Sequence, residues 1–381
     1  MYFTDEQKMI QEMVGKLARD KIASLVKEAD VSGHSSPEII RLLAKNDLLK
    51  TALPEKYGGI GANYTTIAMV VEEMAKVDAS TAMILFVTQS LIQILKQWGS
   101  EEQKDRFFGR MSSGDKINAF SLTESNYGSE SAAIQTKAVL DKDHYVVNGA
   151  KIFVTNGDSA DFILVFVRTG EGERHRGLSA LVVEKDRTPG FCVGKHEDKL
   201  GLRGSDLAEL IFEDARVPRD NLLGKPGQGW DILVTGGADM RAYGPAAMAV
   251  GLAQGALDYA VSYAKQRVQF GGPLSGLQAI RFMLADMSIQ VEAARALTYR
   301  TTALMDSGSD EKGLRSRLVS SSKCFASDVA MRVTTDAVQI LGGYGVMKDY
   351  PVERMMRDAK MIQIFDGSNQ IQRVIVAKNL L

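Results

Sequence analysis

The chain has 381 residues, of which 24% are charged and 45% hydrophobic; these values are typical of a folded soluble protein and exclude a disordered, collagenous or coiled-coil chain. The 46 basic and 47 acidic side chains leave a net charge of -1, so we expect no nucleic acid and no membrane surface as a partner. Cys192 and Cys324 lie far apart and the four histidines have no metal-ligand spacing, so we predict no metal site and a reducing, cytoplasmic location.

Residues 1–114 are predicted to form a helical domain. From Thr4 onward, apolar residues recur at intervals of three and four, as in Met9, Ile10 and Met13, which is the pattern of amphipathic helices. Thr4 and Gln7 fit a capping box that opens the first helix. No apolar stretch looks long enough for the roughly 18 residues that a membrane span needs.

Residues 115–230 are predicted to form a β domain. Segments rich in β-branched and aromatic residues at 144–156, 162–169 and 178–185 are separated by glycine, proline and asparagine, which indicates strands and turns. Asn148-Gly149 has the composition of a two-residue hairpin turn. We therefore expect a β-hairpin turn at Asn148-Gly149.

Residues 231–381 are predicted to be helical again. The alanine-rich segment at 245–263 is apolar on more than one face, so it belongs either at the centre of a helical bundle or in a subunit interface. The order of helices, strands and helices predicts a mainly α protein with a central β domain.

The strongest single candidate for chemistry is Asp366. It lies between Phe365 and Gly367 after an apolar run, and an acid in such surroundings is desolvated, so its pKa rises toward the range of a useful base. The alternative is a helix cap for the segment that follows. The glycines at 342–345 are weak evidence alone, because glycine pairs usually mark turns.

Seven separated segments together resemble the acyl-CoA dehydrogenase family of flavoenzymes, in the order found in that family. They are LPEKYGGIG (53–61), FSLTESNYGS (120–129), NGAKIFVTN (148–156), KLGLRGSDLAEL (199–210), YAKQRVQFGGPLSGLQ (263–278), QILGGYG (339–345) and YPVERMMRDAKMIQIFDGSNQIQ (350–372). The resemblance implies an N-terminal helical domain, a middle β-barrel-like domain and a C-terminal four-helix bundle, with FAD as cofactor. It also implies a homotetramer built from dimers.

The resemblance carries site residues over to this chain. The residues implied to bind FAD are Phe120, Leu122, Thr123, Ser129, Phe153, Val154, Thr155, Arg267, Phe270, Gln278, Gln339, Gly342, Gly343, Ser368 and Gln370. Within that set, the group around Arg267 is expected to reach the FAD of a neighbouring subunit. Those implied to bind the acyl-CoA substrate are Ser129, Asp239, Arg241 and Gly367, and Asp366 stands at the position of the catalytic base.

The chain departs from the family pattern at several of these positions. Ser125 replaces a usual proline, Phe153 a usual tryptophan and Asp366 a usual glutamate. Near the CoA site, alignment from the left pairs Arg241 with the family arginine, whereas alignment from the right pairs Asp239 with the family aspartate. The sequence leaves this register open.

The resemblance implies FAD-dependent α,β-dehydrogenation of an acyl-CoA thioester, with electrons passed on to an electron-transferring flavoprotein. Asp366 would remove the α-proton while the β-hydrogen leaves as hydride to flavin N5. An aspartate is about 1.5 Å shorter than a glutamate, which favours an α-branched or alicyclic substrate: cyclohexanecarboxyl-CoA, oxidised to cyclohex-1-ene-1-carboxyl-CoA. The alternatives are a short straight-chain dehydrogenase, an oxidase or carrier-protein enzyme, and a non-catalytic FAD-binding homologue.

Overall fold

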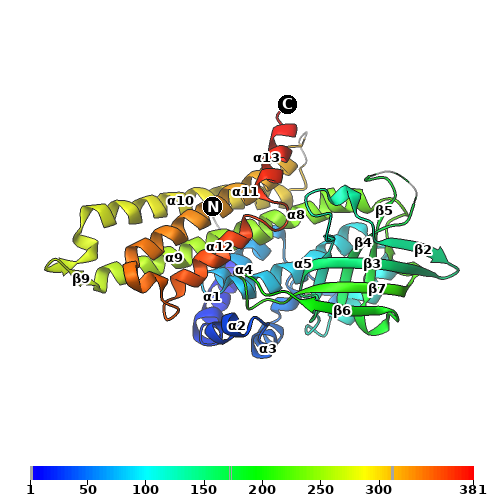
Figure 1. Cartoon of the computed structure of the whole chain (residues 1–381), viewed down its shortest axis with the longest axis horizontal. Coiled ribbons are helices and arrows are strands. Elements are labelled where there is room, and N and C mark those ends of the chain that lie inside the picture. The colour runs from blue at the N-terminus through cyan, green and yellow to red at the C-terminus, as the bar shows by residue number, and fades with distance from the viewer. Residues whose placement is uncertain (1–2, 171, 173, 310–312) are drawn as a thin grey trace.

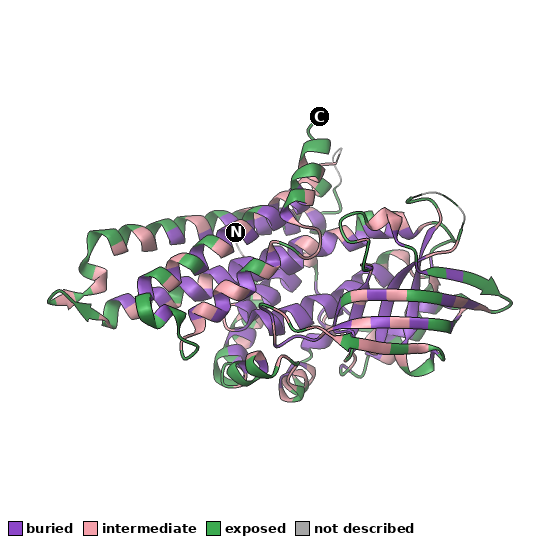
Figure 2. Cartoon of the chain, in the orientation of Figure 1, coloured by how far each residue is buried: buried purple, intermediate pink, exposed green. Residues whose placement is uncertain are grey.

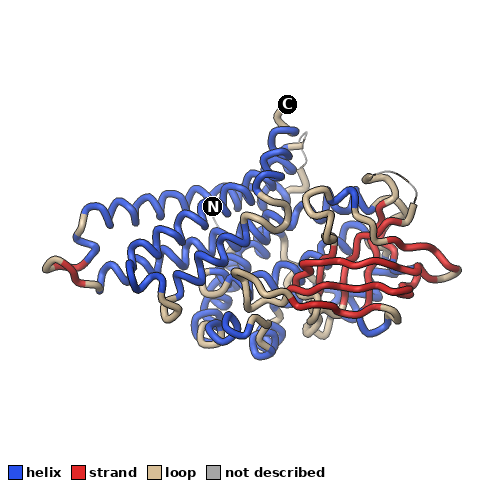
Figure 3. Tube along the Cα trace, viewed as in Figure 1, coloured by secondary structure: helices blue, strands red, loops and turns tan. Residues whose placement is uncertain are grey.

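The computed structural model describes residues 3–170, 172, 174–309 and 313–381. It shows an elongated molecule with a β-sheet at one end and long helices running to the other (Figures 1 and 3). The predicted order of helices, strands and helices is confirmed, and with it the mainly α fold with a central β domain.

The N-terminal region is helical, as expected. Its α-helices are α1 (Asp5–Leu17), α2 (Val26–Ser32), α3 (Pro37–Lys45), α4 (Tyr64–Ala75), α5 (Ala79–Trp98) and α6 (Glu101–Met111). The capping box is confirmed: the Thr4 hydroxyl accepts a hydrogen bond from the backbone of Gln7, and the Gln7 side chain accepts one from the backbone of Thr4.

Helix α5 corrects the expectation about apolar stretches. It is long and apolar enough to cross a membrane, with a mean hydropathy of 1.3, but 94% of its apolar window is buried inside the protein. Figure 2 shows the same burial along the helices in the middle of the molecule. α5 is therefore accounted for as the core helix that joins the N-terminal helices to the sheet.

The β domain is an eight-stranded sheet with the order β6-β7-β3-β2-β4-β5-β8, and β1 pairs with β4. The strands are β1 (Asn118–Ser121), β2 (Lys137–Asp141), β3 (His144–Thr155), β4 (Phe162–Arg168), β5 (Leu178–Glu184), β6 (Phe191–His196), β7 (Leu207–Pro218) and β8 (Leu222–Leu223).

The predicted hairpin turn at Asn148-Gly149 is wrong. Both residues lie inside β3, where the pairing with β7 shifts register between Val147 and Gly149. The turn before β3 instead includes Lys142, with a φ of 57°. A Cβ on Gly149 would stand 2.7 Å from the Thr136 hydroxyl, so this glycine allows a close approach of β2 and β3 and a bulge, not a reversal.

The C-terminal helices form the long body of the molecule in Figure 1. They are α7 (Gly229–Ile232), α8 (Ala238–Arg241), α9 (Ala247–Gln266), α10 (Gln278–Asp306), α11 (Leu314–Leu341), α12 (Pro351–Ile362) and α13 (Asn369–Lys378), with a short hairpin of β9 (Val268–Gln269) and β10 (Gly272–Pro273). Helix α9 packs against α4, α10 and α11, so the apolar faces at 245–263 are covered within the chain, as an interior helix.

Candidate active site

The loop at 363–368, between α12 and α13, carries Asp366 in an uncommon backbone conformation. Asp366 has a φ of 53° and Gly367 one of 83°, and non-glycine residues held in this region cluster at functional sites. The cap of α13 is Ser368, whose hydroxyl accepts a hydrogen bond from the Ile371 backbone at 3.4 Å. The helix-cap alternative for Asp366 is therefore wrong.

Three side chains hold the carbonyl groups of this loop. Arg241 Nε donates to the Asp366 carbonyl at 2.9 Å, and Lys323 Nζ donates to the Gly367 carbonyl at 3.0 Å. Gln372 Nε2 donates to both carbonyls, at 3.3 and 2.8 Å. Because a Cβ on Gly367 would stand 2.6 Å from Gln372 Nε2, only glycine leaves room for this contact.

The Asp366 carboxylate itself is left free to react. Its Oδ2 is buried and has no hydrogen-bond partner among the described residues. Burial raises the pKa of Asp366 to about 6, although Arg241 and Lys323 act in the opposite direction. At neutral pH the group is therefore mainly ionised but close to titration, which is the condition a general base needs.

Lys323, on α11, is the cation that sequence reasoning missed. Its side chain is fully buried and contacts Gly367 and Asn369, and burial lowers its pKa to about 8. In the sequence, the only signal for Lys323 is its place as the one charged residue of the helical segment at 318–327.

The structure explains why the register around Asp239 and Arg241 stayed open. Helix α8 is flanked by two π-helical segments, at Leu233–Gly237 and Ala242–Ala246. A π-bulge adds one residue to an α-helix, so alignments made from its two sides differ by one position.

The two candidates in this helix have different partners. Asp239 is paired through both oxygens with Arg315, with Nε at 3.0 Å, whereas Arg241 contacts the Asp366 loop. The structure thus brings Arg241, Asp366 and Gly367 together and places Asp239 in a separate ion pair. Their predicted contacts with CoA remain a prediction.

The two segments expected to flank the flavin ring lie side by side. The Thr123 carbonyl accepts from the Ile152 backbone at 2.9 Å. Lys151, fully buried, donates to the Leu122 carbonyl at 3.1 Å and to Glu124 at 2.8 Å. This lysine, absent from the expected site residues, fixes the loop that carries Leu122 and Thr123.

The residues expected at the flavin ring differ in how far they are exposed. Phe153 has a φ of 56° and a side chain that is 56% exposed, while Val154 and Thr155 beside it are buried. Phe120 is half-buried on β1, and the adjacent Ser121 hydroxyl is buried without a partner among the described residues. Ser129 and Ser125 are exposed.

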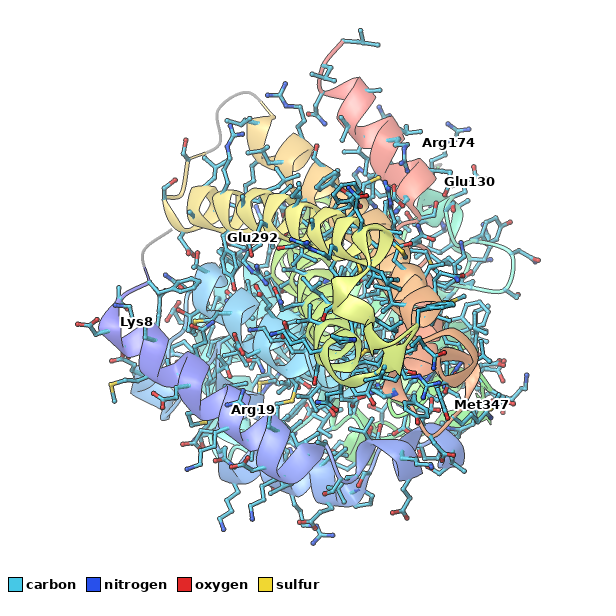
Figure 4. All side chains as sticks on the ribbon, turned by 90° about the vertical axis from the view of Figure 1, so that its left-hand side faces the viewer. Lys8, Arg19, Glu130, Arg174, Glu292 and Met347 are labelled. Atoms are coloured by element: carbon cyan, nitrogen blue, oxygen red, sulfur yellow. The ribbon has the colours of Figure 1, made fainter. Side chains whose placement is uncertain are left out.

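The other expected FAD contacts gather at the opposite end of the molecule. A pocket of about 650 Å³ is lined by Arg267, Gly342, Gly343 and Met347, among others, and Met347 is labelled on that end in Figure 4. A Cβ on either glycine would meet nothing within 4 Å. A guanidinium beside open glycine backbone suits a pyrophosphate group, so the residues present fit the outer half of FAD.

The remaining predicted residues are on the surface. Phe270 is 94% exposed in the β9–β10 hairpin, and Gln278 and Gln339 are exposed near the same end. Gln370 is exposed on α13. Helix α9 separates the Arg241 and Arg267 regions, and its 20 residues span about 30 Å. One chain therefore does not bring the two groups of FAD residues to one place.

Comparison with known proteins covers almost the whole chain. It matches the models for the acyl-CoA dehydrogenase N-terminal domain over residues 4–115, the middle domain over 119–215 and the C-terminal domain over 227–381. Fold and site thus define an FAD-dependent oxidoreductase that acts on CH–CH bonds. The chain belongs to the acyl-CoA dehydrogenase family.

Individual relatives show how far the similarity extends. A cyclohex-1-ene-1-carbonyl-CoA dehydrogenase of Geobacter metallireducens is 44% identical over 100% of this chain and 99% of its own. Butyryl-CoA dehydrogenase of Megasphaera elsdenii superposes with a TM-score of 0.95 at 41% identity, over 100% of this chain and 99% of its own.

A further match comes from the structure described as "Electron transferring flavoprotein of Acidaminococcus fermentans: Towards a mechanism of flavin-based electron bifurcation". Its chain gives a TM-score of 0.96 at 43% identity, over 100% of this chain and 99% of its own.

Proposed function

We propose that this acyl-CoA dehydrogenase oxidises an alicyclic or α-branched thioester, such as cyclohexanecarboxyl-CoA, to its α,β-unsaturated product. The observation that carries the proposal is the Asp366 carboxylate, which is buried with one oxygen unpartnered and one methylene shorter than the glutamate usual in the family. A base that is withdrawn by about 1.5 Å leaves room at the α-carbon, and a ring or branch fills this room.

In this proposal the chain's own groups divide the work. Asp366 Oδ2 accepts the α-proton, and its raised pKa makes the carboxylate a stronger base than an exposed one. Arg241, Lys323 and Gln372 keep the loop still, so the carboxylate meets the substrate in one position. FAD, when bound, supplies the acceptor for the two electrons.

The FAD site is proposed to be completed by a second copy of the chain. The residues for the flavin ring and those around Arg267 lie at opposite ends of the molecule, on the sheet side and at the β9–β10 end (Figure 1). Exposed apolar side chains near that end, Val268, Phe270 and Phe282, suit burial against another subunit. The same proposal includes assembly of the protein as a homotetramer. It also includes the division of each chain into domains at 1–114, 115–230 and 231–381.

The electron acceptor is proposed to be an electron-transferring flavoprotein, supported by the similarity to a chain in the Acidaminococcus fermentans structure. The two cysteines are unpaired, which supports a reducing compartment such as the cytoplasm.

A second candidate substrate is a short straight-chain acyl-CoA, which is supported by the similarity to butyryl-CoA dehydrogenase. Asp366 would reach the α-proton of such a substrate if its loop lies deeper in the site. Steady-state kcat/KM for cyclohexanecarboxyl-CoA, a 2-methyl-branched thioester, butyryl-CoA and octanoyl-CoA separates the two. We expect the ring thioester to lead. A straight chain that equals it would contradict the proposal, and Asp366→Glu should shift the preference toward straight chains by crowding the ring.

A further inference from the structure

The histidines have no metal-ligand spacing along the chain, yet the fold brings two of them and a buried aspartate together. His34, in the loop between α2 and α3, His196, at the end of β6, and Asp206, just before β7, each place one ligand-type atom within 4.8 Å of the others. His34 Nδ1 lies 3.8 Å from Asp206 Oδ1, and the two imidazole rings are 5.1 Å apart.

Asp206 is a buried carboxylate without a matching cation. It is 6% exposed, and no lysine or arginine among the described residues lies within 4.0 Å of it; His34 is its one recorded ionic neighbour. Lys199 is near, but its ammonium donates to the Ser205 carbonyl. A buried charge ordinarily has an opposite charge or a metal beside it, so this position lacks a positive group.

The cluster is held from outside by a set of hydrogen bonds. Asp206 accepts from the Ser35 backbone and from the Ser159 hydroxyl, both at 3.0 Å, which leaves further lone pairs on its oxygens. Asp158, the neighbour of Ser159, stands 3.2 Å from His196 Nε2. Carboxylates that orient ligand histidines in this way are typical of metal sites.

We propose that His34, His196 and Asp206 bind a divalent transition metal of the zinc type. Zn²⁺ takes nitrogen and carboxylate oxygen at about 2.0–2.2 Å, which puts neighbouring ligand atoms roughly 3.4 Å apart in a tetrahedron. The present spread of at most 4.8 Å closes with a modest movement of His34, whose side chain is 60% exposed. Water completes the fourth position.

The site has a structural consequence, since its ligands come from two domains. His34 belongs to the N-terminal helices and the other two ligands to the sheet, whose lower edge adjoins α2 and α3 in Figure 1. The loop just before Asp206 also contacts α12, where the Leu202 backbone donates to Asp358. A bound ion would therefore fasten the junction of three segments.

The test is binding of Zn²⁺ to the untagged, FAD-loaded protein, measured by calorimetry and by elemental analysis after dialysis. We expect one ion per chain at this site, an affinity at least tenfold weaker in His34→Ala, and a thermal midpoint raised by Zn²⁺ in the parent but not in that variant. His144→Ala is the matched control, because His144 is a partly exposed histidine beside Asp143 at the start of β3 and outside the cluster, and it should bind as the parent does.

Two results would overturn the proposal. One is the absence of saturable Zn²⁺ binding; the other is equal binding by His34→Ala and the parent. His34 is exposed and donates no hydrogen bond through its ring in the described structure, so His34→Ala should fold, and the test does not depend on the buried Asp206. Asp206→Asn, where it folds, should lose the same ion.

Discussion

Arg241 Nε donates a 2.9 Å hydrogen bond to the backbone carbonyl of Asp366, and this contact joins α8 to the loop between α12 and α13. Arg241 is the last residue of α8 and lies immediately before the π-helical segment at Ala242–Ala246. The same guanidinium holds down the pKa of the Asp366 carboxyl. Arg241 thus affects both the position and the pKa of Asp366, together with Lys323 and Gln372, which hold the same loop, and with burial, which raises the pKa.

Arg241→Met should slow flavin reduction and shift its pH dependence. Loss of the positive charge raises the pKa of Asp366 above about 6, so a higher pH is needed to ionise the base, and loosening of the loop should cost about tenfold to a hundredfold in rate. Rapid-mixing rates from pH 5 to 9 measure both effects. Arg241→Lys, which keeps the charge, should retain the pH profile of the parent; an unshifted acid limb in Arg241→Met would exclude this role.

Asp366→Asn should stabilise the folded protein at neutral pH. Because the folded pKa of about 6 lies above the ordinary 3.8, the folded state binds more protons between these values, and stability falls as pH rises through that window. The ionised carboxylate thus costs about 1–3 kcal/mol above pH 6. Urea unfolding should show the variant more stable than the parent at pH 7.5 and nearly equal to it at pH 4. A variant less stable at pH 7.5 would contradict the assignment.

Arg267→Ala should weaken FAD binding without unfolding the chain. Its guanidinium lies 5.3 Å from the centre of the Tyr344 ring at the rim of the open pocket. Removing this side chain should therefore take away a contact with a phosphate of FAD and leave the hydrophobic core nearly unchanged. FAD titration followed by fluorescence should give at least tenfold weaker binding, with unchanged far-ultraviolet dichroism. Lys265→Ala, two residues before Arg267, exposed and outside that pocket lining, is the control. Equal affinities for FAD in the parent and both variants would remove Arg267 from the site.

Much of the fold could be predicted from local patterns. The capping box at Thr4 and the change from a helical to a strand period depend on neighbouring residues, and both are confirmed. The turn predicted at Asn148-Gly149 is absent because β3 pairs through these residues with β2 on one side and β7 on the other. This pairing outweighs the local preference for a turn. The sequence shows composition at such a point but not which strands surround it.

The candidate site also contains residues that could be predicted from the sequence and residues that could not. Asp366 was recognisable from its apolar neighbours, whereas Lys323 and Gln372 act on it from α11 and α13 through hydrogen bonds to carbonyl groups, which leave no spacing rule in a sequence. The cluster of His34, His196 and Asp206 is a further case, because its members are 162 and 10 residues apart along the chain. Tertiary contacts of this kind appear only once the domains are packed.

The most direct test of the central claim, that Asp366 is the base, is anaerobic flavin bleaching by an acyl-CoA in the parent and in Asp366→Asn. An amide does not accept the α-proton, so the variant should bind FAD and thioester yet bleach at least a thousandfold more slowly, with the loss in the chemical step. Bleaching of the Asp366→Asn variant at close to the parent rate would contradict the account and place the base elsewhere.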